Sequence, residues 1–438
     1  MSDNEPKNPT QIFMGTDISR NLFGGVLEFD GAGHYPGLEL LNIITGTEGK
    51  NKFPPGETVR ITRTAHDFAR RLVWDEKFDS HPKRQNVFVD EATEDAIRRL
   101  MECLQLEIPS SNKRPSWARA HFFPYSKSLI HWDARQRPLN TNKISIERIY
   151  LRGGGALAYR VLRLDPNLDR LERCKVGFET LFADNKSPLE RLVNVLAGHG
   201  AKDEIPNVDA IEKNSCVRND KLDDLYRDGV ARIVEHIELS SVSRVKALMN
   251  WTGFWLILAQ HQRAAQSINE PAPYLVVDCS GLHPQLRRSS QRSLKDAQAL
   301  IVHAVDEHVK NANGSLPKAS RNRMRGFFWA TAATVKLLNA WRGRRHFTLG
   351  LDILETLVLA ATSGKSELTF DHFVDEWLYR NCRLVVGRNA AEQSGLLASF
   401  DASIFEDNEN HLATQMEAAG LLTQYSDATR MVNTGGLQ

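Results

Sequence analysis

Apolar residues recur with a helical period along most of the chain beyond residue 145. From Ile146 to Leu164 they fall three, four or eight positions apart, which places their side chains on one face of an α-helix, although Gly153-Gly154-Gly155 interrupts the series. Further helices are predicted at about 169–182, 188–196, 222–238, 242–265, 284–310, 321–341 and 349–361. The pattern therefore predicts a mainly α fold.

The first 140 residues follow a different pattern, rich in Gly, Pro, Asn and aromatic residues. Short apolar runs such as 23–29 predict a mixed α/β region with one clear helix at 91–104. A single strand is predicted at 274–279 (YLVVDC), because it is β-branched and flanked by Pro273 and Gly281. We expect three domains in 438 residues: a mixed α/β region at 1–140, a helical domain at 141–345 and a module at 346–438.

The order of elements in the last 90 residues resembles a winged helix. Thr369 is a predicted N-cap, and Gly420 follows a helix in the position that glycine favours. The predicted elements are helices at 349–361, 370–379 and 406–419, an apolar run at 384–386, and hairpin strands at 421–425 and 429–432. Residues 381–404 are expected to be an insertion in this module.

The predicted third helix of this module is acidic and contains no Lys or Arg. Its acidic residues are Glu406, Asp407, Glu409 and Glu417. Because attraction to phosphate supplies most non-specific DNA affinity, an acidic helix is repelled by DNA on approach. We therefore expect this helix to contact protein, through His411 and Gln415, rather than to read a DNA groove.

Charge is strongly segregated along the chain. The net charge is +2, but residues 281–350 contain 13 Lys/Arg against 3 Asp/Glu, which leaves −8 for the remainder. This surplus predicts an anionic partner, with DNA or RNA favoured over an acidic protein or a merely solvated face. The predicted nucleic-acid-binding residues are Arg287, Arg288, Lys318, Arg321, Arg325, Trp329, Lys336, Arg342, Arg344 and Arg345.

The remaining composition favours a cytoplasmic protein. The five cysteines are widely scattered and never form a C-x-x-C pair, so disulfides and a cysteine-based zinc site are not expected. No apolar run approaches the roughly 20 residues that span a bilayer. The polar N-terminus, MSDNEPKNPTQ, lacks the features of a signal peptide.

Several short motifs suggest catalysis or ligand binding without completing a site. Ser363-Gly364-Lys365-Ser366 lacks the first glycine of a P-loop, because position 359 is Leu. Gly153-Gly154-Gly155 offers backbone N–H groups to an anion, but a close helix crossing or a kink is the favoured interpretation. His303 with Asp306 and Glu307 has no second ligand pair for a metal ion. We expect no metal and no cofactor.

Asp278 and Cys279 end the predicted strand, a common position for catalytic groups. No partner acid, base or lysine completes a site with them at the sequence level. An enzyme with a site near Asp278 therefore stays an alternative hypothesis. A second alternative is a winged-helix transcriptional regulator, which predicts a dimer on a palindromic DNA site.

Three segments resemble accessory proteins of bacterial anti-phage defence systems linked to DNA modification, of the phosphorothioation-dependent restriction or methylation-associated type. They are 150–158 (YLRGGGALA), 354–359 (LETLVL) and 420–428 (GLLTQYSDA). The resemblance implies a bacterial cytoplasmic protein that works with an ATPase and a nuclease. It agrees with our leading hypothesis, a non-catalytic, nucleic-acid-associated subunit of a larger assembly.

Overall fold

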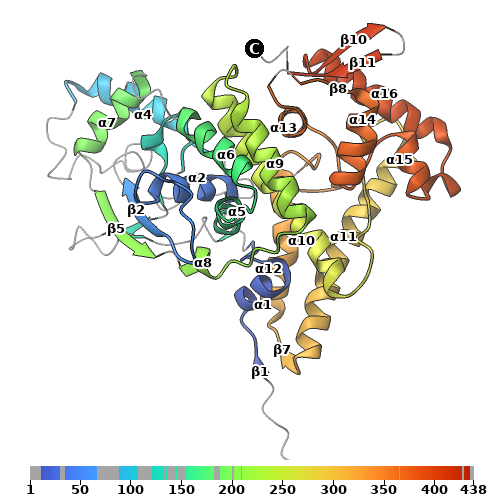
Figure 1. Ribbon diagram of the computed structural model, residues 1–438, viewed down its shortest axis with the longest axis horizontal. Helices are drawn as coiled ribbons and strands as arrows, with labels where there is room; N and C mark the ends of the chain where they lie inside the picture. The colour runs from blue at the N-terminus through green and yellow to red at the C-terminus, as the bar shows by residue number, and fades with distance from the viewer. Residues whose placement is uncertain are drawn as a thin grey trace, which may run out of the picture. The chain divides into compact units, whose positions relative to one another are not determined.

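A computed structural model of the chain shows a mainly helical protein with short strands (Figure 1). The structure describes residues 11–29, 35–66, 88–106, 121–132, 134–136, 144–146, 153–181, 188–199, 202–208, 210–340, 342–364, 366–426 and 429–434. Among these residues no helix has both the length and the apolar character needed to cross a membrane. The predominance of helices among the described elements confirms the prediction of a mainly α fold.

The chain divides into two compact units. Unit 1 comprises Met1–Asp30, Phe254–Leu351 and Leu368–Val432, and unit 2 comprises Gly31–Gly253, Asp352–Glu367 and Asn433–Gln438. These units cut across the three consecutive regions expected from the sequence. The N-terminal helix, for example, belongs to the same unit as the cationic segment, because it packs against the two helices of that segment.

Unit 2 is built mainly from helices, with two separate strand pairs. Its elements are α2 (Pro36–Gly46), β2 (Arg60–His66), α4 (Glu91–Cys103), η3 (Lys127–Leu129), β3 (Ala134–Gln136), β4 (Ile144–Ile146), α5 (Gly154–Arg163), α6 (Leu168–Leu181), α7 (Pro188–His199), β5 (Lys202–Val208), α8 (Ala210–Lys213), α9 (Lys221–Glu235), the first half of α10 (Ser241–Ser267) and nearly all of α13 (Leu351–Ala361). β2 pairs with β5 and β3 with β4, both antiparallel. The main helix contacts are α2 with α5 and α6 with α9.

The crossing of α2 and α5 depends on a glycine. A Cβ atom at Gly155 would lie 2.4 Å from the carbonyl oxygen of Pro36 and 2.5 Å from the amide nitrogen of Leu40. Both neighbours are backbone atoms, so only a residue without a side chain allows the two helices to approach this closely. The expected role of the glycine run, a close helix crossing, is what the structure shows at this position.

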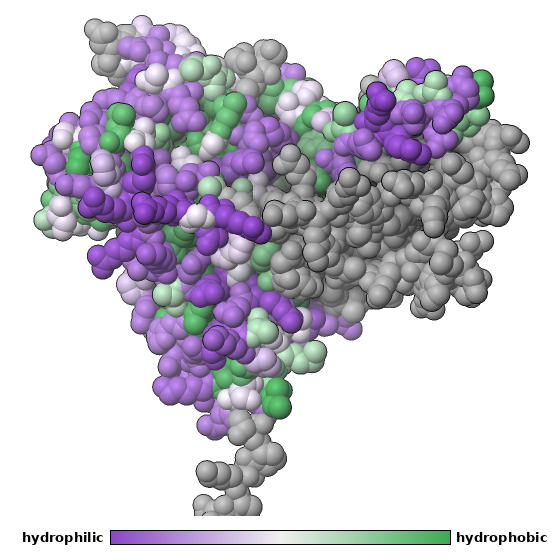
Figure 2. All heavy atoms as spheres, turned by 180° about the vertical axis from the view of Figure 1, so that it is seen from behind, coloured by the Kyte–Doolittle hydropathy of each residue, from purple (hydrophilic) through white to green (hydrophobic). Residues whose placement is uncertain are grey.

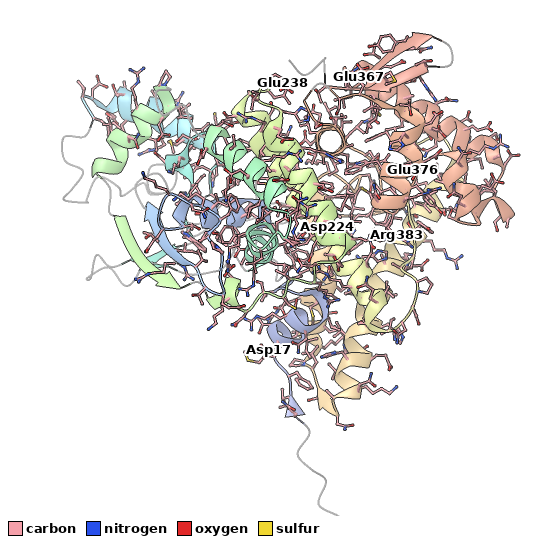
Figure 3. All side chains as sticks on the ribbon, viewed as in Figure 1. Asp17, Asp224, Glu238, Glu367, Glu376 and Arg383 are labelled. Carbon is pink, nitrogen blue, oxygen red and sulfur yellow. The ribbon has the colours of Figure 1, made fainter. Side chains whose placement is uncertain are left out.

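Buried ion pairs connect the helices of unit 2. Arg163 Nε lies 2.6 Å from Glu212 Oε1, and both side chains are fully buried. Arg170 contacts Asp165 at 2.6 Å, and Asp224 and Asp228 of α9 at 2.8 Å each (Asp224 is labelled in Figure 3). Buried charges are stable only when they are paired and hydrogen-bonded, so these arginines are committed to internal partners.

Unit 1 contains the second half of α10 and the elements around it. They are β1 (Gln11–Ile12), α1 (Gly15–Phe23), β6 (Leu275–Val276), α11 (Pro284–Asn311), β7 (Gly314–Ser315), α12 (Lys318–Thr334), β8 (Leu368–Thr369), α14 (Phe370–His372), the π-helix η4 (Phe373–Asn381), β9 (Leu384–Val385), α15 (Arg388–Gln393), η5 (Leu396–Ala398), α16 (Ala402–Ala418), β10 (Leu422–Ser426) and β11 (Thr429–Val432). α11 and α12 lie side by side as a helical hairpin, and β7 between them pairs in parallel with β1 (Figure 1).

A small sheet anchors residues 381–404, the expected insertion, to the rest of unit 1. β9 pairs in parallel with β6, the strand predicted at 274–279, and Val277 forms a further parallel bridge with Phe347. Apolar side chains from both segments, among them Val276, Val385 and Ile404, pack into one cluster. The insertion therefore contributes a strand and part of the core.

A second sheet closes the C-terminal part of unit 1 in the order β10-β11-β8, with both pairings antiparallel. The predicted cap at Thr369 is confirmed, since its Oγ1 accepts the N–H of His372. Gly420 has a φ of +70° after the end of α16, a conformation that favours glycine.

The helix predicted at 321–341 is too long at its C-terminal end. α12 ends at Thr334, and Lys336 has a φ of +62°. Leu337 and Leu338 are buried, and Leu338 forms an antiparallel bridge with Phe347. Strand-like pairing thus replaces the helix, although the apolar spacing fits a helix. Trp341 lies outside the described residues.

Candidate nucleic-acid interface

The ten residues predicted to bind nucleic acid all belong to unit 1, but they do not form one cluster. Arg287 and Arg288 lie near the start of α11. Lys318, Arg321, Arg325 and Trp329 lie on α12, and the other four follow its end. The structure assigns these groups different surroundings.

Arg287 binds the turn that follows β6. Its Nε lies 3.4 Å from Asp278 Oδ2, and its terminal nitrogen donates to the carbonyl oxygen of Gly281. Arg321 is also paired internally, with its Nε 2.6 Å from Asp306 Oδ1 on α11. These two arginines therefore stabilise the fold around α11, and only part of their charge is available to a ligand.

A hollow of about 470 Å³ lies between α11 and α12, and exposed basic side chains line it. Lys295 and His303 reach it from α11, and Arg325 reaches it from α12. Asp306 is the acidic residue in its lining, and Arg321 already neutralises that carboxylate. The hollow is therefore net cationic.

An aromatic–cation pair lies close to this hollow. The Arg345 guanidinium is 4.4 Å from the ring centroid of Trp329, and the ring of Phe29 meets Trp329 edge-on at 5.4 Å. Burial, and then repulsion from Arg325, lowers the pKa of Arg345. Arg325, which lines the hollow, lies one helical turn before Trp329 on α12, so the Trp329–Arg345 pair follows it on the same face of the helix.

The remaining predicted residues surround this surface less closely. Lys318 is exposed as the first residue of α12, and Arg342 and Arg344 are exposed in the loop after it. Lys336 is exposed too, but it lies beyond the helix end and does not share the helical face of Arg321 and Arg325. Arg288 faces a different hollow, beside the first half of α11.

Asp278 holds the turn after β6. Its Oδ1 accepts the N–H of Gly281 at 2.7 Å, and its Oδ2 lies 3.4 Å from Arg287 and 3.8 Å from Nε2 of His346. Burial and the neighbouring Asp278 raise the pKa of the Cys279 thiol, which disfavours a nucleophilic thiolate. These contacts give Asp278 a structural role.

Asn408 is the residue of this region that sequence analysis missed. Its side chain is fully buried; Oδ1 accepts the N–H groups of Cys279 and Ser280, and Nδ2 donates to the carbonyl oxygens of Val277 and Val386. It therefore connects α16 to both strands of the small sheet. The sequence signal that could have identified Asn408 is an asparagine on the apolar face of a predicted helix.

The other short motifs singled out in the sequence do not form ligand sites among the described residues. Glu39 Oε2 accepts the N–H groups of Gly153 at 2.9 Å and Gly155 at 2.8 Å, so an internal carboxylate fills the anion position before α5. Among the described residues no group of His, Cys, Asp and Glu is arranged to hold a metal ion. Lys365, of the P-loop-like segment, lies outside the described residues.

The acidic residues of α16 are directed largely toward unit 1 itself. Glu406 lies 2.5 Å from Arg388, and Asp407 lies 3.0 Å from His283. Glu409 is partly buried, and burial raises its pKa. Of the two residues predicted to contact protein, His411 is exposed, whereas Gln415 is half-buried and donates to the carbonyl oxygen of Leu349.

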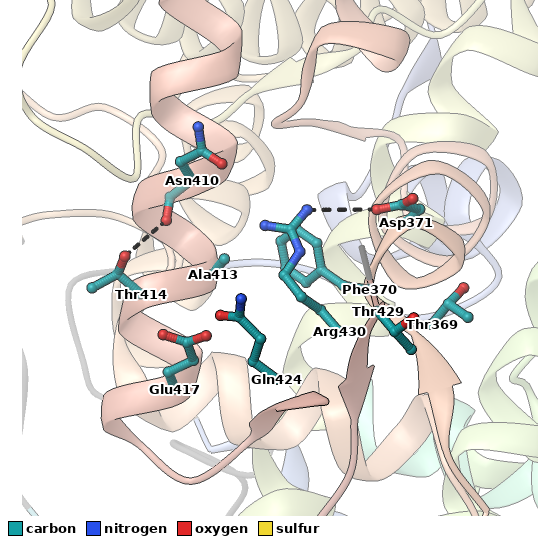
Figure 4. A pocket seen from close by; sticks show the side chains of 10 residues that line it. All are labelled: Thr369, Phe370, Asp371, Asn410, Ala413, Thr414, Glu417, Gln424, Thr429 and Arg430. Carbon is teal, nitrogen blue, oxygen red and sulfur yellow. Dashed lines mark hydrogen bonds and ion pairs between the residues drawn. The ribbon is translucent and has the colours of Figure 1, made fainter. Parts of the chain in front are cut away.

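A polar hollow of about 550 Å³ separates α16 from the β10–β11 hairpin (Figure 4). Asn410, Thr414 and Glu417 line its α16 side, and Gln424 and Arg430 line the hairpin side. Its one cation is already engaged, since Arg430 lies 3.6 Å from Asp371 and 4.3 Å above the ring of Phe370. The hollow therefore offers hydrogen-bonding groups, and the carboxylates of Asp371 and Glu417 outnumber its one cation.

Apolar residues give little further indication of a site. Seen from behind, hydrophilic residues dominate the described surface and apolar residues form only small, separate patches (Figure 2). The hollow between α11 and α12, with Arg325 in a net cationic lining, is the candidate that the charge pattern favours. Comparisons with protein-family models, curated proteins and solved structures found no match to this chain.

Proposed function

We propose that the protein is a non-catalytic subunit that binds nucleic acid with the surface formed by Lys295, Arg325, Trp329, Arg344 and Arg345, hereafter the cationic surface. One observation carries the proposal: Lys295 and Arg325 face a common hollow beside the Trp329–Arg345 stack. The structure shows no acidic side chain paired with Lys295, Arg325 or Arg344 among the residues that it describes.

Phosphate groups fit this arrangement better than other anions do. Several cations gathered at one hollow match the closely spaced charges of a nucleic-acid backbone. Binding of these cations releases the counterions of the backbone. A half-buried indole beside them offers a surface for base or sugar contact. An acidic protein would neutralise the cations of this surface, but its carboxylates would not need the Trp329 indole.

The salt dependence of binding tests the proposal. Anisotropy of a labelled oligonucleotide of about 20 nucleotides is followed between roughly 50 and 200 mM salt, for the wild type and for a Lys295→Ala/Arg325→Ala/Arg345→Ala variant. Loss of three phosphate contacts should lower the slope of log affinity against log salt by about 2 to 3.

The control removes cations that have their own acidic partners. Lys310 lies 3.2 Å from Glu307, and Lys175 lies 3.1 Å from Glu172. A Lys310→Ala/Lys175→Ala variant should leave the salt slope within about half a unit of the wild type, because neither lysine belongs to the cationic surface. No binding at low salt, or binding without salt dependence, would refute the proposal.

We further propose that the C-terminal part of unit 1 is a winged-helix module that contacts another protein subunit. The sheet order β10-β11-β8 supports the winged-helix interpretation, with β8 before the helices and the hairpin after α16. α16 carries no Lys or Arg, which disfavours DNA reading by this helix in a transcriptional regulator. The polar hollow of Figure 4 supplies hydrogen-bonding groups suited to a protein surface.

Affinity purification from the native host tests the subunit proposal. As the resemblance to defence-system accessory proteins implies, we expect co-purification of an ATPase and a nuclease. The contacts should persist after nuclease treatment and weaken in a Thr414→Arg/Gln424→Arg variant, whose added side chains fill the polar hollow. A protein that purifies alone in every condition would contradict the proposal.

A further inference from the structure

A second hollow, of about 790 Å³, lies beside the first half of α11. Residues of α11 form one wall, and residues before β6 and around η5 form the other. Its size lies within the usual range for sites that hold a small molecule or one unit of a polymer. The two walls differ sharply in their chemistry.

The α11 wall is polar and cationic. Arg288, Ser289, Arg292 and Ser293 are spaced so that they share one face of the helix, and all four line the hollow. The Arg292 side chain is 84% exposed, and its acidic neighbour Asp296 is 3.7 Å away, so its donors remain open to solvent. The two guanidinium groups and the Ser289 hydroxyl are suited to phosphate oxygens, whereas the buried Ser293 hydroxyl donates to the carbonyl oxygen of Ser290.

The opposite wall is aromatic and apolar. Both faces of Tyr274 are already covered, by the Arg383 guanidinium at 4.0 Å and by the stacked ring of Tyr379 at 4.8 Å (Arg383 is labelled in Figure 3). Phe400 is half-buried and meets Phe405 in an edge-to-face contact at 5.8 Å. Phe400, with Leu396 beside it in the lining, therefore supplies the apolar surface on which a planar ring can lie.

The two hollows follow one another along α11. On α11, the hollow beside Phe400 is lined by residues between Gln285 and Asp296. The hollow beside α12 is lined by residues between Lys295 and Asp306. At 1.5 Å per residue this stretch of helix is roughly 32 Å long. A ligand that uses both hollows must therefore be an extended polymer rather than a single small molecule.

We propose that the hollow beside Phe400 takes an unpaired nucleotide of a single-stranded nucleic acid, whose phosphates lie at Arg288 and Arg292 and whose base lies on Phe400. The strand then continues along α11 to Lys295 and Arg325. A base in a duplex is stacked between its neighbours and cannot enter between the two walls. This inference rests on the proposed function and specifies the strand state of its ligand.

Binding of matched single-stranded and hairpin-duplex oligonucleotides tests the inference. The variants are Phe400→Ala, Phe400→Leu, which keeps apolar packing against Phe405 but loses the planar ring, and Arg288→Ala/Arg292→Ala. Loss of one stacked base should weaken single-strand binding roughly ten-fold in both Phe400 variants and leave duplex binding unchanged. The double arginine variant should also lower the single-strand salt slope by about 1 to 2.

Tyr425→Ala is the matched control, because this tyrosine is an exposed aromatic residue on β10 and lines neither hollow. It should change neither affinity. Adenosine monophosphate serves as competitor, and it should displace the strand only weakly, because it occupies one hollow. Competition as strong as that of an unlabelled strand would identify a free-nucleotide site and overturn the inference.

The remaining outcomes separate the two proposals. Equal affinity for strand and duplex, with Phe400→Leu within two-fold of the wild type, would overturn the strand inference and leave the cationic surface standing. Absence of binding to either oligonucleotide would overturn both. Circular dichroism and thermal unfolding of Phe400→Leu establish that the variant is folded.

Discussion

Arginines are numerous in both units, and some of them stand in opposite surroundings. In unit 2 Arg163 is fully buried and faces Glu212 at 2.6 Å, while Arg170 contacts three aspartates. In unit 1 Arg288, Arg325 and Arg344 are exposed, and the first two line open hollows. The same residue type therefore serves internal cohesion where it is buried, as at Arg163 and Arg170, and is available to an external anion where it is exposed, as at Arg288, Arg325 and Arg344.

The comparison shows why charge counts alone mislead. A buried guanidinium must have its own carboxylate, because an unpaired charge away from water costs several kcal/mol. An exposed guanidinium keeps its hydration and needs no partner, so it can exchange water for phosphate. Stability in unit 2 should therefore depend on pairing, whereas binding by unit 1 should depend on exposed charge.

The largest expected effect is on the stability of unit 2. Glu212→Ala should lower the free energy of unfolding by about 3 to 5 kcal/mol, because it leaves Arg163 buried without its carboxylate. Chemical denaturation measures the change. The control is Glu57→Ala: Glu57 is 3.1 Å from Arg160, but its side chain is 87% exposed, so its loss should cost less than about 1 kcal/mol. Equal losses in the two variants would contradict the contrast between buried and exposed pairs.

A buried base without a partner should make unit 1 sensitive to acid. His261 is fully buried, and neither ring nitrogen has a hydrogen-bond partner among the described residues. Burial and then repulsion from Arg383 lower its pKa to about 3. The unfolded chain, with an ordinary histidine pKa near 6.5, binds the proton more readily than the folded chain does.

The stability that His261 contributes is therefore complete above about pH 6.5 and is lost as the pH falls toward 3, by up to roughly 1.4 kcal/mol per pH unit. The free energy of unfolding is measured across this pH range for the wild type and for His261→Leu. The difference between the two slopes of free energy against pH gives the contribution of His261. An unchanged slope in the variant would show that His261 does not cause the acid sensitivity.

A smaller effect is expected from backbone crowding at helix crossings. Gly155→Ala places a Cβ 2.4 Å from a backbone oxygen in unit 2 and should cost about 1 to 3 kcal/mol. Gly326→Ala, in α12 of unit 1, meets its nearest atom at 3.3 Å, the ring carbon Cδ1 of Phe29. It should change stability by less than about 1 kcal/mol, because helix propensity favours alanine. Thermal unfolding compares the two variants, and a larger loss at Gly326 would contradict the packing argument.

The smallest effect on stability is expected at the exposed cations. Arg344→Ala should stay within about 0.5 kcal/mol of the wild type in unfolding experiments. The same variant should lower the salt slope of oligonucleotide binding by about 1, since one phosphate contact is lost. A variant that destabilises the fold without changing the slope would place Arg344 with the structural arginines.

Local elements were predictable because their causes are local. Helical periodicity located α4, α6, α9, α10 and α11 to within a few residues, and β-branched residues between breakers located β6. The cap at Thr369 and the glycine after α16 follow from side-chain and backbone chemistry within a few positions. The surplus of positive charge in 281–350 is likewise a property of the chain itself.

Which cations remain available was decided by tertiary structure. Nothing near Arg287 or Arg321 in the sequence shows that they would face Asp278 and Asp306, whereas Lys295 and Arg325 would face a hollow. Glu39 fills the anion position before α5 from more than 110 residues away in the chain. Asn408 joins α16 to strands that are far from it in sequence.

The sequence by itself therefore determined the helical elements, their caps and the concentration of charge, because spacing and residue type act over a few positions. Tertiary structure alone decided the end of α12, the pairing of β9 with β6 and the division of arginines into buried and exposed groups. The physical reason is that burial and pairing depend on which distant segments meet, and local sequence does not encode those contacts.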